Sequence, residues 1–180
     1  DENIQIPAII HAYRTPGKTE RDASVLNMIS NILSGGKSAR LYKKMVDENK
    51  SALEVAAINL SQEDYGVYIT FALPMEGNSL DQLTKEIDEE IVRLQTDLIS
   101  EREYEMLLNT FENRYVQSSS SIEGIASSRA DYYSFDSEVS KINEELKLYQ
   151  SITREEIRDV ARRYLNPNQR LRLEYLPKED

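Results

Sequence analysis

The chain has 180 residues, with 22 basic and 32 acidic side chains and a formal net charge of −10 at pH 7. This length is enough for one domain with a buried core, and the acidity argues against a nucleic-acid partner and against docking on an anionic membrane. Because the chain has no cysteine and a single histidine, His11, it excludes disulfides and a self-contained catalytic zinc site.

The first elements expected along the chain are a strand and a helix. Residues 4–13 alternate as a strand does, and Pro7, which cannot donate to a ladder, indicates an edge strand or the beginning of one. Apolar residues then recur at helical spacing over 19–34, with Thr19 as the expected N-cap. The glycine pair 35–36 is expected to end this helix.

A second short helix is expected over 38–48, followed by two strands over 52–60 and 66–73. The polar segment 61–64 between these strands predicts a turn, so the pair is expected to form an antiparallel hairpin. An amphipathic helix is expected to follow Ser79, with its apolar residues at i, i+4 and i+8.

The second half of the chain is expected to be mainly helical. The serine run 118–121 indicates a loop, and the last element, over 169–176, alternates as a strand that can return to the first sheet. Helices are expected over 100–116, 123–135, 138–149 and 153–165, the first and last opened by capping boxes.

Few and unevenly spaced strands argue against a doubly wound parallel sheet. We therefore expect an α+β fold, an antiparallel β-sheet with helices packed on one face, in which residues 1–180 form a single domain. No stretch is long and apolar enough to span a membrane, and the first residues lack the features of a signal peptide. Membrane insertion is not expected, and both a periplasmic and a cytoplasmic location remain open.

Few residues of the chain suggest chemistry of their own. His11 lies in an apolar strand and is expected to be a satisfied or surface imidazole rather than a ligand. The acidic runs 88–90 and 101–103 match no EF-hand loop and are expected to be solvated helix faces. Tyr132 and Tyr133 could form a recognition surface, although packing at the margin of the core is the commoner role of such residues.

Two stretches of the chain resemble a known family. Residues 33–42, LSGGKSARLY, resemble the Gly-rich "LGGGxSSRL(F/Y)" stretch of the pitrilysin/insulinase-type zinc metallopeptidases, which include mitochondrial processing peptidase. The closing stretch 152–177, ITREEIRDVARRYLNPNQRLRLEYLP, also resembles the end of a half-domain of that family. The resemblance covers nearly the whole chain.

This resemblance implies an enzyme built from two similar α+β halves that close around a peptide. The catalytic half carries the motif HxxEH, whose histidines bind zinc together with a distant glutamate. Because a chain with one histidine cannot contain that motif, it resembles the C-terminal, non-catalytic half. Zinc is then expected in the catalytic half of the full-length protein, in the same chain or in a separate subunit, and no cofactor is expected in this chain.

No catalytic residue is expected in this half. Alignment on the "SRL" stretch places Val46 and Leu53 where active members often carry an arginine and a tyrosine that reach the substrate. We expect these apolar residues to pack as ordinary helix and strand residues. The candidate substrate-binding residues are Gly35, Gly36 and Arg40, with an ion pair inside the domain as the alternative role of Arg40.

The expected function is that of a non-catalytic domain that walls the substrate chamber and binds an extended peptide, for example as a strand added to a sheet edge. The alternative is a catalytically inactive scaffold or accessory subunit of a protein complex. A metal-free hydrolase would need a nucleophile and a base that the sequence does not offer.

Overall fold

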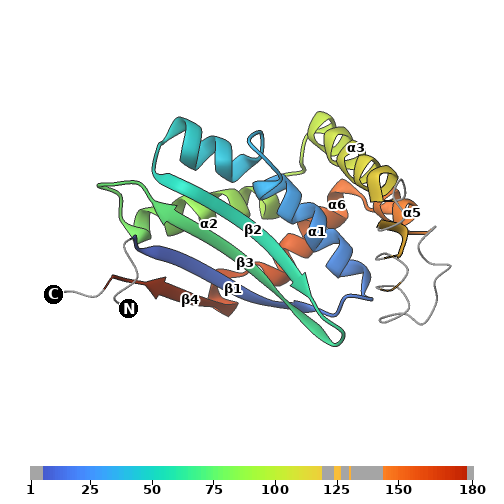
Figure 1. Cartoon of the computed structure of the whole chain (residues 1–180), viewed down its shortest axis with the longest axis horizontal. Helices are drawn as coiled ribbons and strands as arrows, with labels where there is room; N and C mark the ends of the chain where they lie inside the picture. Colours follow the sequence, from blue (N-terminus) through green and yellow to red (C-terminus); the bar gives the residue numbers. More distant parts are fainter. Residues whose placement is uncertain (1–5, 119–123, 127–129, 131–143, 178–180) are drawn as a thin grey trace.

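The computed structural model describes residues 6–118, 124–126, 130 and 144–177. Four strands form one antiparallel sheet in the order β2-β3-β1-β4 (Figure 1). The strands are β1 Ala8–Pro16, β2 Ala52–Ser61, β3 Tyr65–Pro74 and β4 Arg170–Tyr175. The α-helices are α1 Arg21–Ser34, α2 Leu80–Thr96, α3 Glu101–Ser118, α5 Glu145–Ser151 and α6 Arg154–Tyr164; η1 Tyr42–Glu48 is a π-helix and η3 Pro167–Gln169 a 3₁₀-helix.

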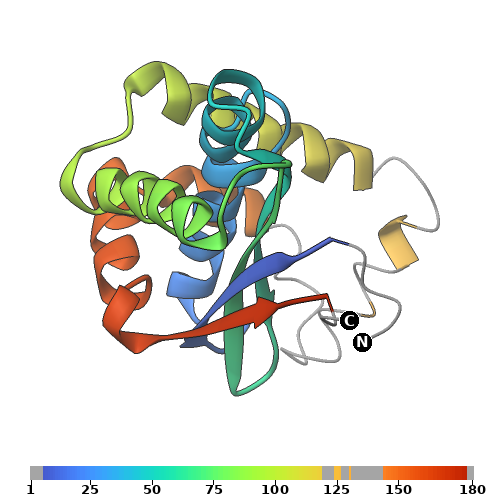
Figure 2. The same cartoon turned by 90° about the vertical axis from the view of Figure 1, so that its left-hand side faces the viewer.

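The expected α+β fold is confirmed. Helices α1, α2 and α6 lie on one face of the sheet (Figure 2), and α3 packs with α5 against α1 beyond the edge strand β2. The core between the sheet and the helices is mainly apolar and includes Ile9, Leu26, Met28, Ile29, Leu33, Tyr68, Ile87 and Ile91. No described helix is both long and apolar enough to cross a membrane.

The first strand begins directly after Pro7. This proline therefore marks the beginning of a strand, which is one of the two predicted alternatives. Strand β1 is not an edge strand, because it lies between β3 and β4. A single row of register partners crosses the sheet from Ala57 in β2 through Thr70 and His11 to Arg172 in β4. The C-terminal strand therefore returns to the first one, as predicted.

The ends of the helices agree with most of the predicted caps. Ser79 accepts a hydrogen bond from the Gln82 N–H at 3.2 Å, and Thr153 and Glu156 form the predicted capping box. Thr19 as the cap of α1 is wrong: the N-cap is Glu20, which makes no side-chain cap hydrogen bond. The helix 38–48 is only partly α-helical, since η1 is a π-helix in which Asn49 N–H bonds Lys44 O at 2.9 Å.

Several expectations concern residues outside the described part of the chain. These are the serine loop from Ser119 onward, most of the helix over 123–135, the tyrosines Tyr132 and Tyr133, and the beginning of the helix over 138–149. Within the described residues, α5 covers the end of the last of these helices and continues two residues beyond it.

The second face of the sheet is mainly apolar, and none of the long helices among the described residues lies on it (Figure 2). We call this surface the open face. Its exposed side chains are Ile58, Leu60, Val67, Leu171, Leu173 and Tyr175, and its half-buried ones are Ile10, Ala12, Ile69 and Phe71. In β4 the polar residues point to the helices instead, where Arg170 pairs with Asp88 and Arg172 with Asp81 of α2.

Candidate functional site

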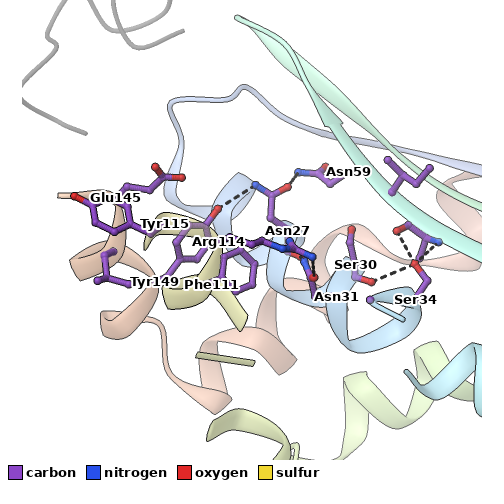
Figure 3. Close-up of a pocket in the computed structure, with 14 residues that line it drawn as sticks. Asn27, Ser30, Asn31, Ser34, Asn59, Phe111, Arg114, Tyr115, Glu145 and Tyr149 are labelled. Carbon is purple, nitrogen blue, oxygen red and sulfur yellow. Dashed lines mark hydrogen bonds between the residues drawn. The ribbon is translucent and has the colours of Figure 1, made fainter. Parts of the chain in front are cut away.

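A hollow lies at the outer edge of the sheet (Figure 3). Its volume is about 530 Å³. One side is formed by α1 and the middle of β2, and the opposite side by α3 and α5. Its lining residues are Asn27, Ser30, Asn31, Ser34, Gly35, Ala57, Ile58, Asn59, Phe111, Arg114, Tyr115, Glu145, Leu146 and Tyr149.

A polar stripe of α1 forms the floor of the hollow. Asn27, Ser30, Asn31 and Ser34 follow one another at intervals of three and four residues, so they share one side of the helix. The apolar residues of α1 face the core. The helix is therefore amphipathic, with its polar stripe along the hollow.

Ser34 covers part of the backbone at the edge of β2. Its hydroxyl accepts a hydrogen bond from Ala57 N–H at 2.8 Å and donates to Ala57 O at 3.0 Å. In an antiparallel ladder the outward-pointing groups alternate along the strand, so the backbone of Asn59 points to the same side. The hollow thus opens beside a strand edge at which a further strand would bond.

A network of asparagines connects β2 with α1 and α5. The Asn59 side-chain amide donates to Asn27 Oδ1 at 3.0 Å and to Ala23 O at 3.1 Å, and Asn27 in turn donates to the Tyr149 hydroxyl at 3.4 Å. Asn59 Oδ1 is buried and has no hydrogen-bond partner among the described residues. A buried acceptor without a partner costs free energy.

The opposite wall is aromatic. Phe111 and Tyr149 stack with their ring centroids 4.1 Å apart, and the Arg114 guanidinium lies 5.5 Å from the Phe111 centroid. Arg114 also donates to Asn31 Oδ1 at 2.6 Å across the hollow. Burial raises the pKa of the Tyr149 hydroxyl above its ordinary value, which keeps it neutral.

The glycine pair lies at the end of the hollow. Gly35 lines it, and a Cβ atom at this position would lie 2.5 Å from Asn31 O, so only glycine allows this close approach. Gly36 has φ of +123°, which side chains rarely allow, and an added Cβ there would meet no atom within 4 Å. A contact of either glycine with substrate stays a prediction.

Arg40 lies outside the lining of the hollow. Its Nε and Nη2 atoms each donate to a carboxylate oxygen of Glu103 in α3, both at 2.7 Å. Burial opposes its charge, but the hydrogen bonds with Glu103 outweigh burial and raise the pKa of Arg40. The structure therefore contains the ion pair that was the alternative role of Arg40, and substrate binding by this residue stays a prediction.

We expect the Arg40–Glu103 pair to contribute modestly to stability. Arg40→Ala should lower the free energy of unfolding by about 1 kcal/mol, since the pair is bidentate but partly solvated. A double-mutant cycle with Glu103→Ala, followed by urea denaturation, measures their coupling. Zero coupling would contradict a structural role for Arg40.

The two apolar positions that replace the family's arginine and tyrosine differ from each other. Val46 is half-buried against the core, as expected. Leu53 does not pack: it is 48% exposed and lies where the β2–β3 register shifts between Ala52 and Glu54. The expectation of ordinary strand packing at Leu53 is therefore wrong, because the irregular register turns its side chain outward.

His11 is a satisfied core residue. It is fully buried, with Nδ1 3.3 Å from Thr70 Oγ1 and Nε2 3.3 Å from Thr84 Oγ1. Burial and, secondly, the charge of Arg170 lower its pKa to about 4. Within the described ranges, no three His, Cys, Asp or Glu residues gather as metal ligands would.

Sequence reasoning missed most of the residues that line the hollow. The available signal was the polar stripe of α1 at helical spacing together with Asn59 in an otherwise apolar strand. The contributions of Phe111, Arg114 and Tyr149 could not be found this way, because only the tertiary fold brings α3 and α5 beside β2.

Comparisons with known proteins agree with this architecture. Residues 1–111 match the profile of the family described as "Peptidase M16 inactive domain". A curated relative, the zinc protease PqqE of Helicobacter pylori, is 23% identical over 131 residues, which cover 73% of this chain and 30% of that protein. The chain thus spans less than a third of this relative's length.

Solved structures share the fold. A protease from Helicobacter pylori superposes with a TM-score of 0.91 at 19% identity, covering 98% of this chain and 43% of that one. An inactive peptidase domain from Bordetella parapertussis superposes with a TM-score of 0.85 at 19% identity, covering 97% and 92%. A peptidase M16 inactive domain from Pseudomonas fluorescens gives 0.79 at 14% identity, covering 98% and 42%.

Proposed function

Because this chain belongs to the peptidase M16 inactive-domain family, we propose that it is the non-catalytic half of a zinc metalloprotease and that it holds the peptide substrate. Catalysis would then belong to a second half, in the same chain or in a separate subunit. This is the function that the sequence resemblance implied.

The residues of this chain do not fit a catalytic zinc ion. Its one histidine is enclosed between two threonines, and the described carboxylates do not converge with it on one point. A zinc site of the usual composition needs several such ligands and an open coordination position. We therefore assign the zinc, the activated water and peptide-bond cleavage to the other half.

The observation that carries peptide binding is the position of the hollow against the edge of β2. An extended peptide presents N–H and C=O groups at regular spacing, and a strand edge and asparagine side chains can bond both. For a peptide strand to pair with Ala57, the Ser34 hydroxyl must first leave the backbone groups that it covers.

The test is the cleavage of β-casein by the full-length protein. Asn31→Leu removes polar groups from the hollow at similar side-chain volume and should raise KM roughly five- to tenfold, a loss of about 1 kcal/mol of binding. We expect kcat to stay unchanged, because the reacting atoms lie in the other half.

Asn113→Leu is the matched control, since Asn113 is exposed on α3 and does not line the hollow. It should leave KM at the wild-type value. Equal KM values for the wild type and both variants would contradict a peptide site in the hollow. Absence of any cleavage by the full-length protein would favour the alternative, a catalytically inactive scaffold or accessory subunit.

A further inference from the structure

We propose that the open face of the sheet is the surface on which the catalytic half packs. This inference rests on the proposed function and adds to it the place at which the two halves meet. It concerns a different side of the molecule from the peptide hollow, which lies at the edge of β2 and toward the helices; the two surfaces meet at Ile58.

The two central rows of the open face are apolar across all four strands, and the rows on either side of them contain Arg14 and Glu54. Register partners Ile58, Ile69, Ala12 and Leu171 form one row across the sheet, and Ala56, Phe71, Ile10 and Leu173 form the next. Both rows lack a charged side chain. Exposed apolar patches of this continuity mark interaction surfaces in soluble proteins.

The orientation of β4 supports the same conclusion. Its leucines point away from the core, with Leu171 66% exposed, whereas the side chain of Arg170 is only 11% exposed on the helix side. In an isolated domain with water on its outer side, the reverse orientation would be expected. The observed orientation is favourable if a second apolar surface covers the leucines.

The size of the open face favours a tethered partner over a second copy. Four strands about 4.8 Å apart and four side-chain rows about 7 Å apart give a footprint of roughly 500 Å². Stable complexes of free chains bury about 800 Å² on each partner. A half that is linked covalently needs less area, because the linker supplies an effective concentration in the millimolar range.

The charge of this chain and the length of its relatives also favour the catalytic half as the partner that covers the open face. Two copies of this chain would bring together two bodies with a net charge of −10 each, which repel one another. An anionic membrane would also repel this chain. The Helicobacter protease that shares this fold is more than twice as long as this chain, since the match covers 43% of it. A second body of similar size is therefore available in such proteins to cover the face.

The test uses thiol labelling of single-cysteine variants of the full-length protein, because this chain has no cysteine of its own. Leu173→Cys probes the open face, and Val92→Cys on the outer side of α2 is the matched control, with exposures of 48% and 46% in this domain. We expect Leu173→Cys to react with a maleimide at least about tenfold more slowly than Val92→Cys, independently of protein concentration.

Each other result overturns the inference. Equal rates would show that the face is uncovered. Protection that grows with protein concentration would identify a second copy, and protection only with phosphatidylglycerol vesicles would identify a membrane. Casein cleavage by the same preparations separates the two proposals. If casein is cleaved but the two cysteines are labelled at equal rates, only the proposed interface is wrong. If Leu173→Cys is protected but casein is not cleaved, the half that covers the open face is not catalytic.

Discussion

Lowering the pH from 7.5 to 4 should remove about 3 kcal/mol of folding stability through His11 alone. Burial and the nearby Arg170 favour the neutral imidazole in the folded state and lower its pKa from 6.5 to about 4. The unfolded chain therefore takes up a proton first. The stabilising effect is fully present above pH 6.5 and is lost as the pH falls through the interval between the two pKa values.

The measurement is urea denaturation across this pH range for the wild type and His11→Gln. Glutamine can still bond Thr70 and Thr84 but does not titrate in this interval. The carboxylates of the protein titrate in both proteins, so the difference between the two profiles isolates His11. Parallel profiles would contradict the buried neutral imidazole.

Replacing Lys44 should be the most damaging of the charge changes. Its ammonium group lies 2.7 Å from Glu89 Oε2 and 3.1 Å from Glu90 Oε1, and it connects η1 to α2. Glu90 is only 2% exposed and otherwise pairs with Arg93 at 3.2 Å. Lys44→Met leaves that buried carboxylate with one partner, and we expect a loss of roughly 2–3 kcal/mol.

Two further variants make this expectation specific. Lys43→Met removes the neighbouring lysine, which is exposed and 4.0 Å from Glu48, and should change stability by less than about 0.5 kcal/mol. The double variant Lys44→Met with Glu90→Leu removes both charges and should recover most of the loss. If thermal or urea unfolding showed that Lys43→Met loses as much stability as Lys44→Met, this expectation would be wrong.

The acidic run 88–90 shows how far sequence patterns reach. It was expected to be a solvated helix face, which is right only for Glu89. Asp88 pairs with Arg170 of β4 and Glu90 with Lys44 of η1, and both partners are distant in the chain. A helical pattern identifies which residues share a side of α2, but it does not show which cations the fold will bring to them.

Strand alternation has the same limit. It correctly predicted β1, the β2–β3 hairpin and the return of β4 to β1. It separates Leu171 and Leu173 from Arg170 and Arg172, but it cannot show which set faces the helices. In this protein α2 supplies aspartates to the arginines, so the leucines are left outside.

The positions of the first and last strands also determine how the domain responds to force. Ala8, at the start of β1, is the register partner of Tyr175, at the end of β4, and the two strands run in opposite directions. Tension applied at these two points would load the backbone bonds at one end of the ladder and break them in succession. The domain would then yield by peeling of β4 from the sheet, well before the hairpin and the helical layer come under load.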